Sequence, residues 1–321
     1  MKRGLHMNNP VEDIVGLDWS DGEITAARVD VSPLGAVRLL HVGSAHVPAG
    51  ASDDAVVAAL RELWRSAGMP SHTVAASLRS RSVVVRPFSY PALQPEEFRA
   101  AVRLEAEETL QLRADEIALD WHLNQNGAPS EVGKAGRPFN GLLVAAPLRE
   151  VENHQRILQQ AGLFPVILEL GATAVANLYQ ATHREPKACD DVCVLLLTPQ
   201  SAEVAILFEG DGLYARTLYA RGGSWDQSVQ TLIEGVQDAL KYFVFKLRGR
   251  PVRKLVVTGR LPAQADFLDV VRSKTDVPVE AWDPVSTARA SSARVRAALQ
   301  KGMPSSLAIS MGLSLRRYAS D

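Results

Sequence analysis

The chain has 321 residues, of which 46% are hydrophobic and 22% are charged, the balance of a globular protein long enough to form two lobes. Its 35 lysines and arginines offset 36 acidic residues, and a formal net charge of -1 excludes a protein that binds nucleic acid or anionic lipid through overall charge. Two cysteines exclude a disulfide framework and suit a reducing cytosol, and the apolar run 192–197 is too short to cross a membrane.

The chain opens with three predicted strands, a helix and a fourth strand. Turn residues such as Gly22 and Pro33 separate the strands. In the helix, apolar residues recur every three or four positions until Gly68 ends it. The predicted elements are strands over 14–19, 23–31 and 37–47, a helix over 53–67 and a strand over 73–78.

The same order of elements recurs in the second half of the chain. Strands are predicted over 191–197, 202–208 and 213–220, a helix over 225–247 and a strand over 255–258. Such a repeat indicates a duplicated α/β unit. Three antiparallel strands followed by a helix and a parallel strand are typical of a ribonuclease-H-like lobe, and two such lobes in one chain predict the actin-like α/β architecture.

A smaller α/β unit lies between the two repeats. It includes a strand over 83–85 that Pro87 ends, a helix from 94 to about 110, and strands over 117–122 and 142–146, followed by further helices and a strand up to residue 180. We predict three parts: a first lobe over 12–186 with an inserted α/β subdomain over about 83–170, a second, shortened lobe over 187–302, and a closing helix over 303–321 that returns to the first lobe.

Several short motifs occur along the chain in a familiar order. They are Gly16-Leu17-Asp18, Glu105-Ala106-Glu107-Glu108, Gly222-Gly223 before the long helix, Leu255-Val256-Val257-Thr258-Gly259 and the tail Ser306 to Leu313. In this order they resemble the PilM family, the actin-like component of type IV pilus assembly, and the resemblance extends from about Asp13 to Arg317. The cytoplasmic part of the type II secretion protein GspL has a similar plan and stays an alternative.

The resemblance implies a cytoplasmic scaffold that is peripheral to the inner membrane through its partners. The expected partners are the cytoplasmic peptide of a PilN-like inner-membrane protein and other pilus assembly components. Neither nucleic acid binding nor direct membrane insertion is expected. We place the peptide in a groove between the first lobe and the insert, with strand addition as one mode of binding. The residues nearest this groove are Val83, Val85, Phe88, Tyr90 and Phe98.

Many members of that family bind ATP between the lobes. The positions that match such a cleft here are Asp18, Ser20, Gly22, Gly222, Gly223 and Gly259. An actin-type site holds phosphate with the backbone amides of two hairpins, each usually with an aspartate that orients magnesium-bound water. The first hairpin keeps Asp18 and Gly22, but Asp21 adds negative charge and Thr25 stands where a lysine is usual.

The second hairpin departs further from the family pattern. The stretch 195–200 has neither aspartate nor glycine, and Pro199 lacks an amide donor. Nucleotide-binding members of the family have two or three glycines in the turn that contacts adenosine, and here Gly259 is the single glycine of that turn. They also have a stretch between the glycine pair and the following helix, and this stretch is absent after Gly223. We therefore expect a vestigial cleft with no cofactor and no catalytic residue, in which Asp18 caps backbone amides. An actin-fold ATPase or kinase that binds ATP and magnesium at an unusual site is the alternative.

Two further patterns concern metal and charge. Cys189 and Cys193 have no second pair of ligands nearby, so we predict no metal site and expect Cys193 to pack in a strand. A basic cluster follows the long helix, where exposed carbonyls favour cations, and an acidic partner or an anionic lipid surface is the alternative explanation. Its members are Lys241, Lys246, Arg248, Arg250, Arg253 and Lys254.

Overall fold

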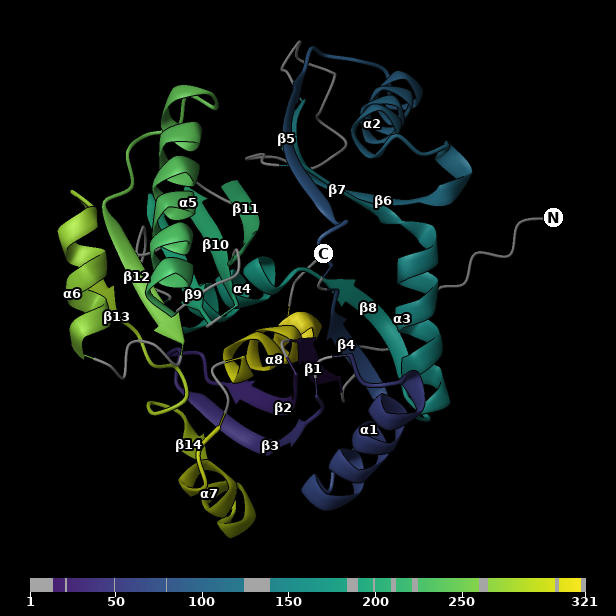
Figure 1. The fold of residues 1–321 in the computed structure, drawn as a ribbon, viewed down its shortest axis with the longest axis vertical. Coiled ribbons are helices and arrows are strands. Elements are labelled where there is room, and N and C mark those ends of the chain that lie inside the picture. Colours follow the sequence, from purple (N-terminus) through teal and green to yellow (C-terminus); the bar gives the residue numbers. More distant parts are fainter. Residues whose placement is uncertain are drawn as a thin grey trace.

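A computed structural model describes residues 14–20, 22–48, 50–78, 80–123, 139–183, 190–198, 200–208, 212–220, 225–259, 265–303 and 306–318. These residues form three β-sheets with flanking helices (Figure 1). In the figure the first sheet lies at the bottom, the second at the left and the third at the top right. No helix within these ranges is both long enough and apolar enough to cross a membrane.

The first sheet has six strands in the order β14-β3-β2-β1-β4-β8. It is antiparallel among β1, β2 and β3 and parallel where β1, β4 and β8 meet. Helices α1 and α3 pack on one face, and α7 lies beside β3. The bounds are β1 Val15–Ser20, β2 Glu23–Val31, β3 Val37–His46, β4 Thr73–Ser77, β8 Phe164–Glu169, β14 Arg289–Ala290, α1 Asp53–Ala67, α3 Leu148–Gln160 and α7 Ala293–Gln300.

Helix α1 has the bounds predicted from the sequence because both of its ends are marked. The side chain of Ser52 accepts a hydrogen bond of 3.4 Å from the backbone N–H of Ala55. At the other end Gly68 adopts φ 63°, the left-handed conformation that glycine reaches without a steric cost. The apolar stripe between these two residues is buried against β3 and α3.

The second sheet has five strands in the order β11-β10-β9-β12-β13. β9, β10 and β11 are antiparallel, and β12 pairs with β9 and β13 in parallel. All six residues of β9 are buried, which confirms that Cys193 packs inside a strand. The bounds are β9 Val192–Leu197, β10 Ser201–Phe208, β11 Gly212–Tyr219, β12 Lys254–Gly259, β13 Val279–Ala281, α5 Trp225–Phe245 and α6 Ala265–Lys274.

The third sheet has the order β5-β7-β6 and is antiparallel. Helix α2 covers one of its faces over an aromatic core, in which Phe98 stacks on Phe139 with 4.6 Å between the ring centroids. The bounds are β5 Val84–Tyr90, α2 Pro95–Leu110, the 3-10 turn η1 Ala114–Glu116, β6 Ile117–Leu123 and β7 Phe139–Pro147.

Three sequence-based boundaries differ from the structure. Strand β5 runs through Pro87, because β5 is an edge strand, where a proline that lacks an N–H is tolerated. The insert was expected over 83–170, but β8 pairs with β4 in the first sheet and α3 packs on α1. In the predicted second lobe, β14 pairs instead with β3 of the first sheet.

Two helices lie between the first and second sheets (Figure 1). They are α4, Gly171–Thr182, and α8, Leu307–Ser314, which the turn η3, Leu315–Tyr318, follows. Helix α8 packs on β1, β2 and α4, while α4 also contacts β9, β10 and β11. A Cβ added to Gly312 would lie 1.8 Å from the carbonyl oxygen of Ala174, so the two helix backbones touch. One buried core therefore extends from the first sheet through both helices into the second.

A candidate peptide groove and a candidate nucleotide cleft

Asp18 lies in the middle of β1 and is fully buried. Its register partner across the β1–β2 hairpin is Thr25. The Asp18 carboxylate accepts a hydrogen bond from the hydroxyl of Ser77, at the end of the neighbouring strand β4. A buried carboxylate needs such donors, because an unpaired charge in a core is costly. Asp18 is thus held by protein groups inside the fold rather than exposed to a cleft.

Helix α8 supplies the other polar contacts around this hairpin. The Ser310 hydroxyl accepts a hydrogen bond of 3.2 Å from the Asp18 amide, lies 2.6 Å from the Thr25 hydroxyl and donates to the Thr25 carbonyl. One turn later, Ser314 accepts from the amide of Val29, where a bulge interrupts the β2–β3 ladder. Helix α8 therefore satisfies backbone groups of β1 and β2 that lie under it.

The turns of the two hairpins line one cavity of about 360 Å³. Trp19 and Gly22 come from the first hairpin and Gln200 from the second. Gly22 has φ 80°, which explains a glycine in this tight turn. No cationic side chain belongs to the described lining of the cavity. Phosphate groups would therefore meet no counter-charge from these residues.

Trp19 also makes a contact with helix α3. Its ring stacks on that of His154, with 5.5 Å between the ring centroids and 19° between the planes. Burial lowers the pKa of His154 to about 4, so the imidazole is neutral at physiological pH. The aromatic pair fixes one side of the first hairpin without adding charge.

The second hairpin turn is closed by Thr198. Its hydroxyl accepts hydrogen bonds from the amides of Ser201, at 3.0 Å, and Gln200, at 3.3 Å. The Thr198 amide in turn donates to the Ser201 carbonyl over 2.9 Å. In an actin-type site, amides of this turn point toward phosphate. Here a side chain of the same turn already holds them.

The other positions matched to a nucleotide site are placed as follows. Ser20 is the last residue of β1 and pairs with Glu23. Gly259 ends β12 beside Leu197, and with φ 122° a Cβ there would lie 2.2 Å from the Leu197 carbonyl oxygen. This puts Gly259 at the same end of the sheet as the Thr198 turn. Gly222, Gly223, Asp21 and Pro199 lie outside the described residues.

Most of the residues predicted to surround a peptide groove form the core of the insert. Phe88 and Phe98 are buried, with relative exposures of 6% and 5% and 5.6 Å between their ring centroids. The Tyr90 hydroxyl hydrogen-bonds to Glu105, and burial together with this carboxylate raises the tyrosine pKa. Val85 is partly buried, and the amide of Val83 donates to Ser80. Phe88 and Phe98 pack in the core of the insert, and Phe88 also lines a cavity beside β5.

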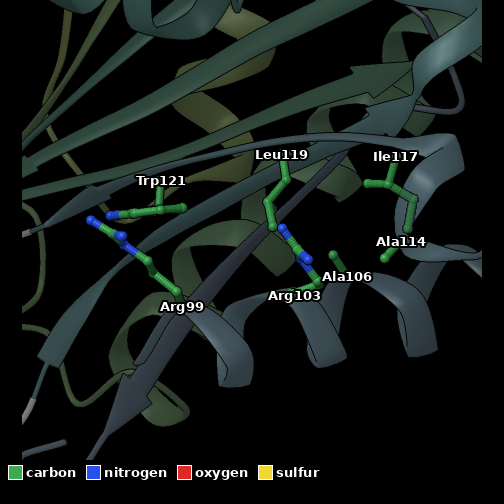
Figure 2. Close-up of a pocket in the computed structure, with 7 residues that line it drawn as sticks. All are labelled: Arg99, Arg103, Ala106, Ala114, Ile117, Leu119 and Trp121. Carbon is green, nitrogen blue, oxygen red and sulfur yellow. The ribbon is translucent and has the colours of Figure 1, made fainter. Parts of the chain in front are cut away.

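A groove also lies between α2 and the edge strand β6 (Figure 2). Its volume is about 230 Å³. Ile117, Leu119 and Trp121 alternate along β6 and face the helix, while Arg99 and Arg103 extend from successive turns of α2 toward them. This alternation is visible in the sequence and could have located the groove. In the described part of the chain, β6 pairs with β7 alone.

Both arginines of this groove carry charge into it. Both residues are exposed, and neither makes an ion pair with another described residue. Arginine presents five donors in a planar fork that fits carbonyl and carboxylate oxygens. The groove therefore combines an apolar floor, two free guanidinium groups and a strand edge, which together suit an extended peptide.

Comparisons with known proteins agree with this architecture. The family described as type IV pilus assembly protein PilM matches residues 16–232. No curated protein matches the sequence. Among solved structures, a PilM-PilN type IV pilus biogenesis complex aligns with a TM-score of 0.76 at 20% identity, covering 96% of this chain and 99% of the other. The protein thus has the actin-like α/β fold predicted from its sequence.

Two further solved structures are more distant. A Bacteroides thetaiotaomicron protein with an actin-like ATPase fold and unknown function aligns with a TM-score of 0.47 at 11% identity, covering 90% of this chain and 96% of the other. The cytoplasmic domain of EpsL, an inner membrane component of the type II secretion system of Vibrio cholerae, gives a TM-score of 0.47 at 10% identity and covers 92% and 97%.

Proposed function

The chain belongs to the PilM family of type IV pilus assembly proteins, and we propose that it is a cytoplasmic scaffold that docks a short peptide of a PilN-like inner-membrane protein. The observation that carries the proposal is the groove between α2 and β6 (Figure 2). The solved structure of similar fold is a complex of PilM with PilN. The scaffold reaches the inner membrane through this partner and joins other assembly components there.

The groove supports an extended peptide in two ways. Strand β6 offers a row of backbone donors and acceptors on its outer edge, which an added strand can pair with. Leu119 and Trp121 give apolar side chains of the peptide a surface to cover, and Arg103 can bind its carbonyl or carboxylate oxygens. Strand pairing supplies affinity and the side-chain contacts supply selectivity.

The cleft between the two hairpins, in this proposal, no longer binds ATP. Thr198 holds the amides of its own turn, Asp18 is buried under Ser77 and Ser310, and the described cavity lining has no cation. Each of these features removes a group that an actin-type site needs for phosphate or for magnesium-bound water. The protein then acts by holding partners rather than by hydrolysing a nucleotide.

The test is a titration with the labelled cytoplasmic end of the PilN-like protein from the same organism, followed by fluorescence anisotropy. We expect specific binding that magnesium and ATP leave unchanged. Arg99→Glu combined with Arg103→Glu should weaken binding at least tenfold, about 1.4 kcal/mol or more. Arg65→Glu is the matched control, since Arg65 lies on α1 and pairs with Glu62.

Three outcomes would contradict the proposal. Absence of peptide binding removes the scaffold function, and equal weakening by Arg65→Glu removes the groove as its site. Calorimetric binding of ATP that is lost in Asp18→Ala would instead support the alternative of an actin-fold ATPase. An Asp18→Ala protein that unfolds at lower urea but shows no change in nucleotide response supports a structural role for Asp18.

A further inference from the structure

A second cavity, of about 680 Å³, lies between the third sheet and the second lobe. β5 and β7 form one wall, with Ser89 and Asn140, and the end of α5 forms the other. Asp191 and Phe208 also line it, and they stand at the start of β9 and the end of β10. Because the hairpin turn at Thr198 is at the opposite end of these strands, roughly 20 Å away, this cavity is separate from the nucleotide cleft.

The α5 wall of this cavity is positively charged. Lys246, Arg248 and Arg250 line it, and the one acid in the described lining is Asp191. Asp191 pairs with Arg250 at 3.4 Å. Lys246 and Arg248 are exposed and form no ion pair with another described residue. The described lining therefore has an excess of positive charge that an acidic ligand would complement.

Aromatic residues line the floor of this cavity, and others lie outside it. Phe208, Tyr214 and Phe243 belong to the lining, whereas Phe245, 78% exposed, and Tyr242, 40% exposed, lie near the end of α5 outside the described lining. Tyr242 lies 6.2 Å, ring to ring, from Tyr214 in the cavity wall, where Phe208 and Phe243 also contact each other. Exposed aromatic rings beside arginines are the composition of protein interfaces rather than of ordinary surface.

Arg248 occupies an unfavourable backbone conformation. Its φ is 55°, in the left-handed region that glycine adopts with least strain, and it follows the end of α5 at a position where helices often carry glycine. The turn around it is fixed by hydrogen bonds from Leu247 to Tyr242 and from Gly249 to Phe243. A purely structural turn would gain stability from glycine at 248, so the arginine side chain points to a role of its own.

We propose that this cavity, the α5 cleft, docks an acidic segment of a protein partner, distinct from the peptide of the α2–β6 groove. Carboxylates of the segment pair with Lys246 and Arg248, and an apolar side chain fills the aromatic floor. Strand β5 pairs only with β7 among the described strands, and β11 of the second lobe lies in contact with both of them. The cavity floor is recessed between two walls, so a protein segment can reach it and the headgroups of a flat membrane cannot. Because part of the lining is apolar, a protein segment also fits it better than free phosphate does.

The test uses a labelled synthetic peptide, Asp-Glu-Leu-Phe-Asp-Glu, and its amide counterpart, Asn-Gln-Leu-Phe-Asn-Gln, with the full chain in fluorescence anisotropy. We expect binding of the acidic peptide that weakens at least tenfold with Lys246→Glu or Arg248→Gly and with the amide peptide. Lys241→Glu, on the same helix but outside the cavity lining, should change affinity less than twofold. The urea midpoint of Arg248→Gly should equal or exceed that of the wild type.

Several results would overturn the inference. Equal loss with Lys241→Glu would show attraction to overall charge, and a lower urea midpoint for Arg248→Gly would show that Arg248 is structural. The cleft would be a lipid surface if the acidic peptide fails to bind and phosphatidylserine vesicles bind in a way that Lys246→Glu abolishes. It would be an anion site if inorganic phosphate alone competes with the peptide. Arg99→Glu with Arg103→Glu should leave acidic peptide binding intact, so failure here is separable from failure of the α2–β6 groove.

Discussion

At the scale of single residues, Asp18 has neighbours that its position in the sequence does not predict. Asp18 stands where an actin-type aspartate is expected, yet Ser77 donates to its carboxylate and α8 covers it. A carboxylate held in this way stabilises the fold only while its donors stay in place. The residue type alone therefore does not reveal the role of Asp18, because its neighbours come from β4 and from the C-terminal helix.

His154 gives a residue-scale prediction about pH. Its folded pKa of about 4 lies below the ordinary 6.5, so both states are neutral above pH 6.5. Between pH 6.5 and 4 the unfolded chain binds a proton that the folded chain does not, and the free energy of unfolding falls as pH falls. We expect His154 to account for a loss of about 2 kcal/mol between pH 7.5 and 5, measured by urea unfolding.

The control is His154→Gln. Between pH 7.5 and 5 its free energy of unfolding should fall by about 2 kcal/mol less than that of the wild type, because glutamine does not titrate. His41 also has a lowered pKa, from burial and from Arg28, so the difference between wild type and variant isolates His154. Identical pH profiles for the two proteins would show that the imidazole stacked on Trp19 titrates normally.

At the scale of elements, the turn of the β9–β10 hairpin is held by one of its own side chains, Thr198. Thr198→Val removes the hydroxyl that accepts hydrogen bonds from the backbone amides of Gln200 and Ser201. Those two amides then lose this acceptor. We expect a loss of about 1–3 kcal/mol in the free energy of unfolding. Thr198→Ser keeps the hydroxyl and should lose less than half of that in the same urea titration. Equal losses would mean that the methyl group, not the hydroxyl, closes the turn.

Elements were predictable from sequence where their causes are local. Helix α1 follows from Ser52, Gly68 and its apolar stripe, and the duplicated strand order predicts the two lobes. The end of the insert was not predictable, because only the pairing of β8 with β4 assigns it to the first sheet. Partners such as Ser77 and Ser310 were likewise missed, since each is distant from Asp18 along the chain.

The candidate peptide groove shows the same division. The placement of the peptide near β5 and α2 stays a prediction, and the structure adds that Phe88 and Phe98 are packed in the insert core. Apolar periodicity identifies the face of an element that is buried, and it does not say which apolar residues remain at the rim. The rim is set by how far α2 extends over the edge strand β6, which is a property of packing.

At the scale of the whole molecule, α4 and α8 make one core out of two lobes. The buried cluster includes residues of the first sheet such as Val29, of both helices and of β9 to β12. The aromatic core of the insert is separate from it. Sliding of α4 and the second sheet past α8 would break the backbone contact between Gly312 and α4, while the serines of α8 tie that helix to the first sheet. Such continuity indicates that the two lobes are stabilised as one body.

The shared core predicts that the two lobes unfold together. Trp64 is buried in the first lobe, and Trp282 packs edge-on against Tyr179 of α4 with 5.2 Å between the ring centroids. The fluorescence of a variant that retains only Trp64 therefore reports unfolding of the first lobe, and that of a variant that retains only Trp282 reports unfolding beside α4. Both should show the same urea midpoint. Gly312→Ala, which forces α8 away from α4, should lower both midpoints together, by a few kcal/mol in the free energy of unfolding.

Gly235→Ala is the matched control, because a Cβ there meets the flexible side chain of Leu218 at 3.0 Å and replaces a glycine within α5. Its effect should stay within about 1 kcal/mol, since the gain in helix propensity offsets the contact. Separate midpoints for Trp64 and Trp282, or a shift of only one by Gly312→Ala, would mean that each lobe folds alone. In that case α8 would be a detachable strap and the cleft between the lobes could open.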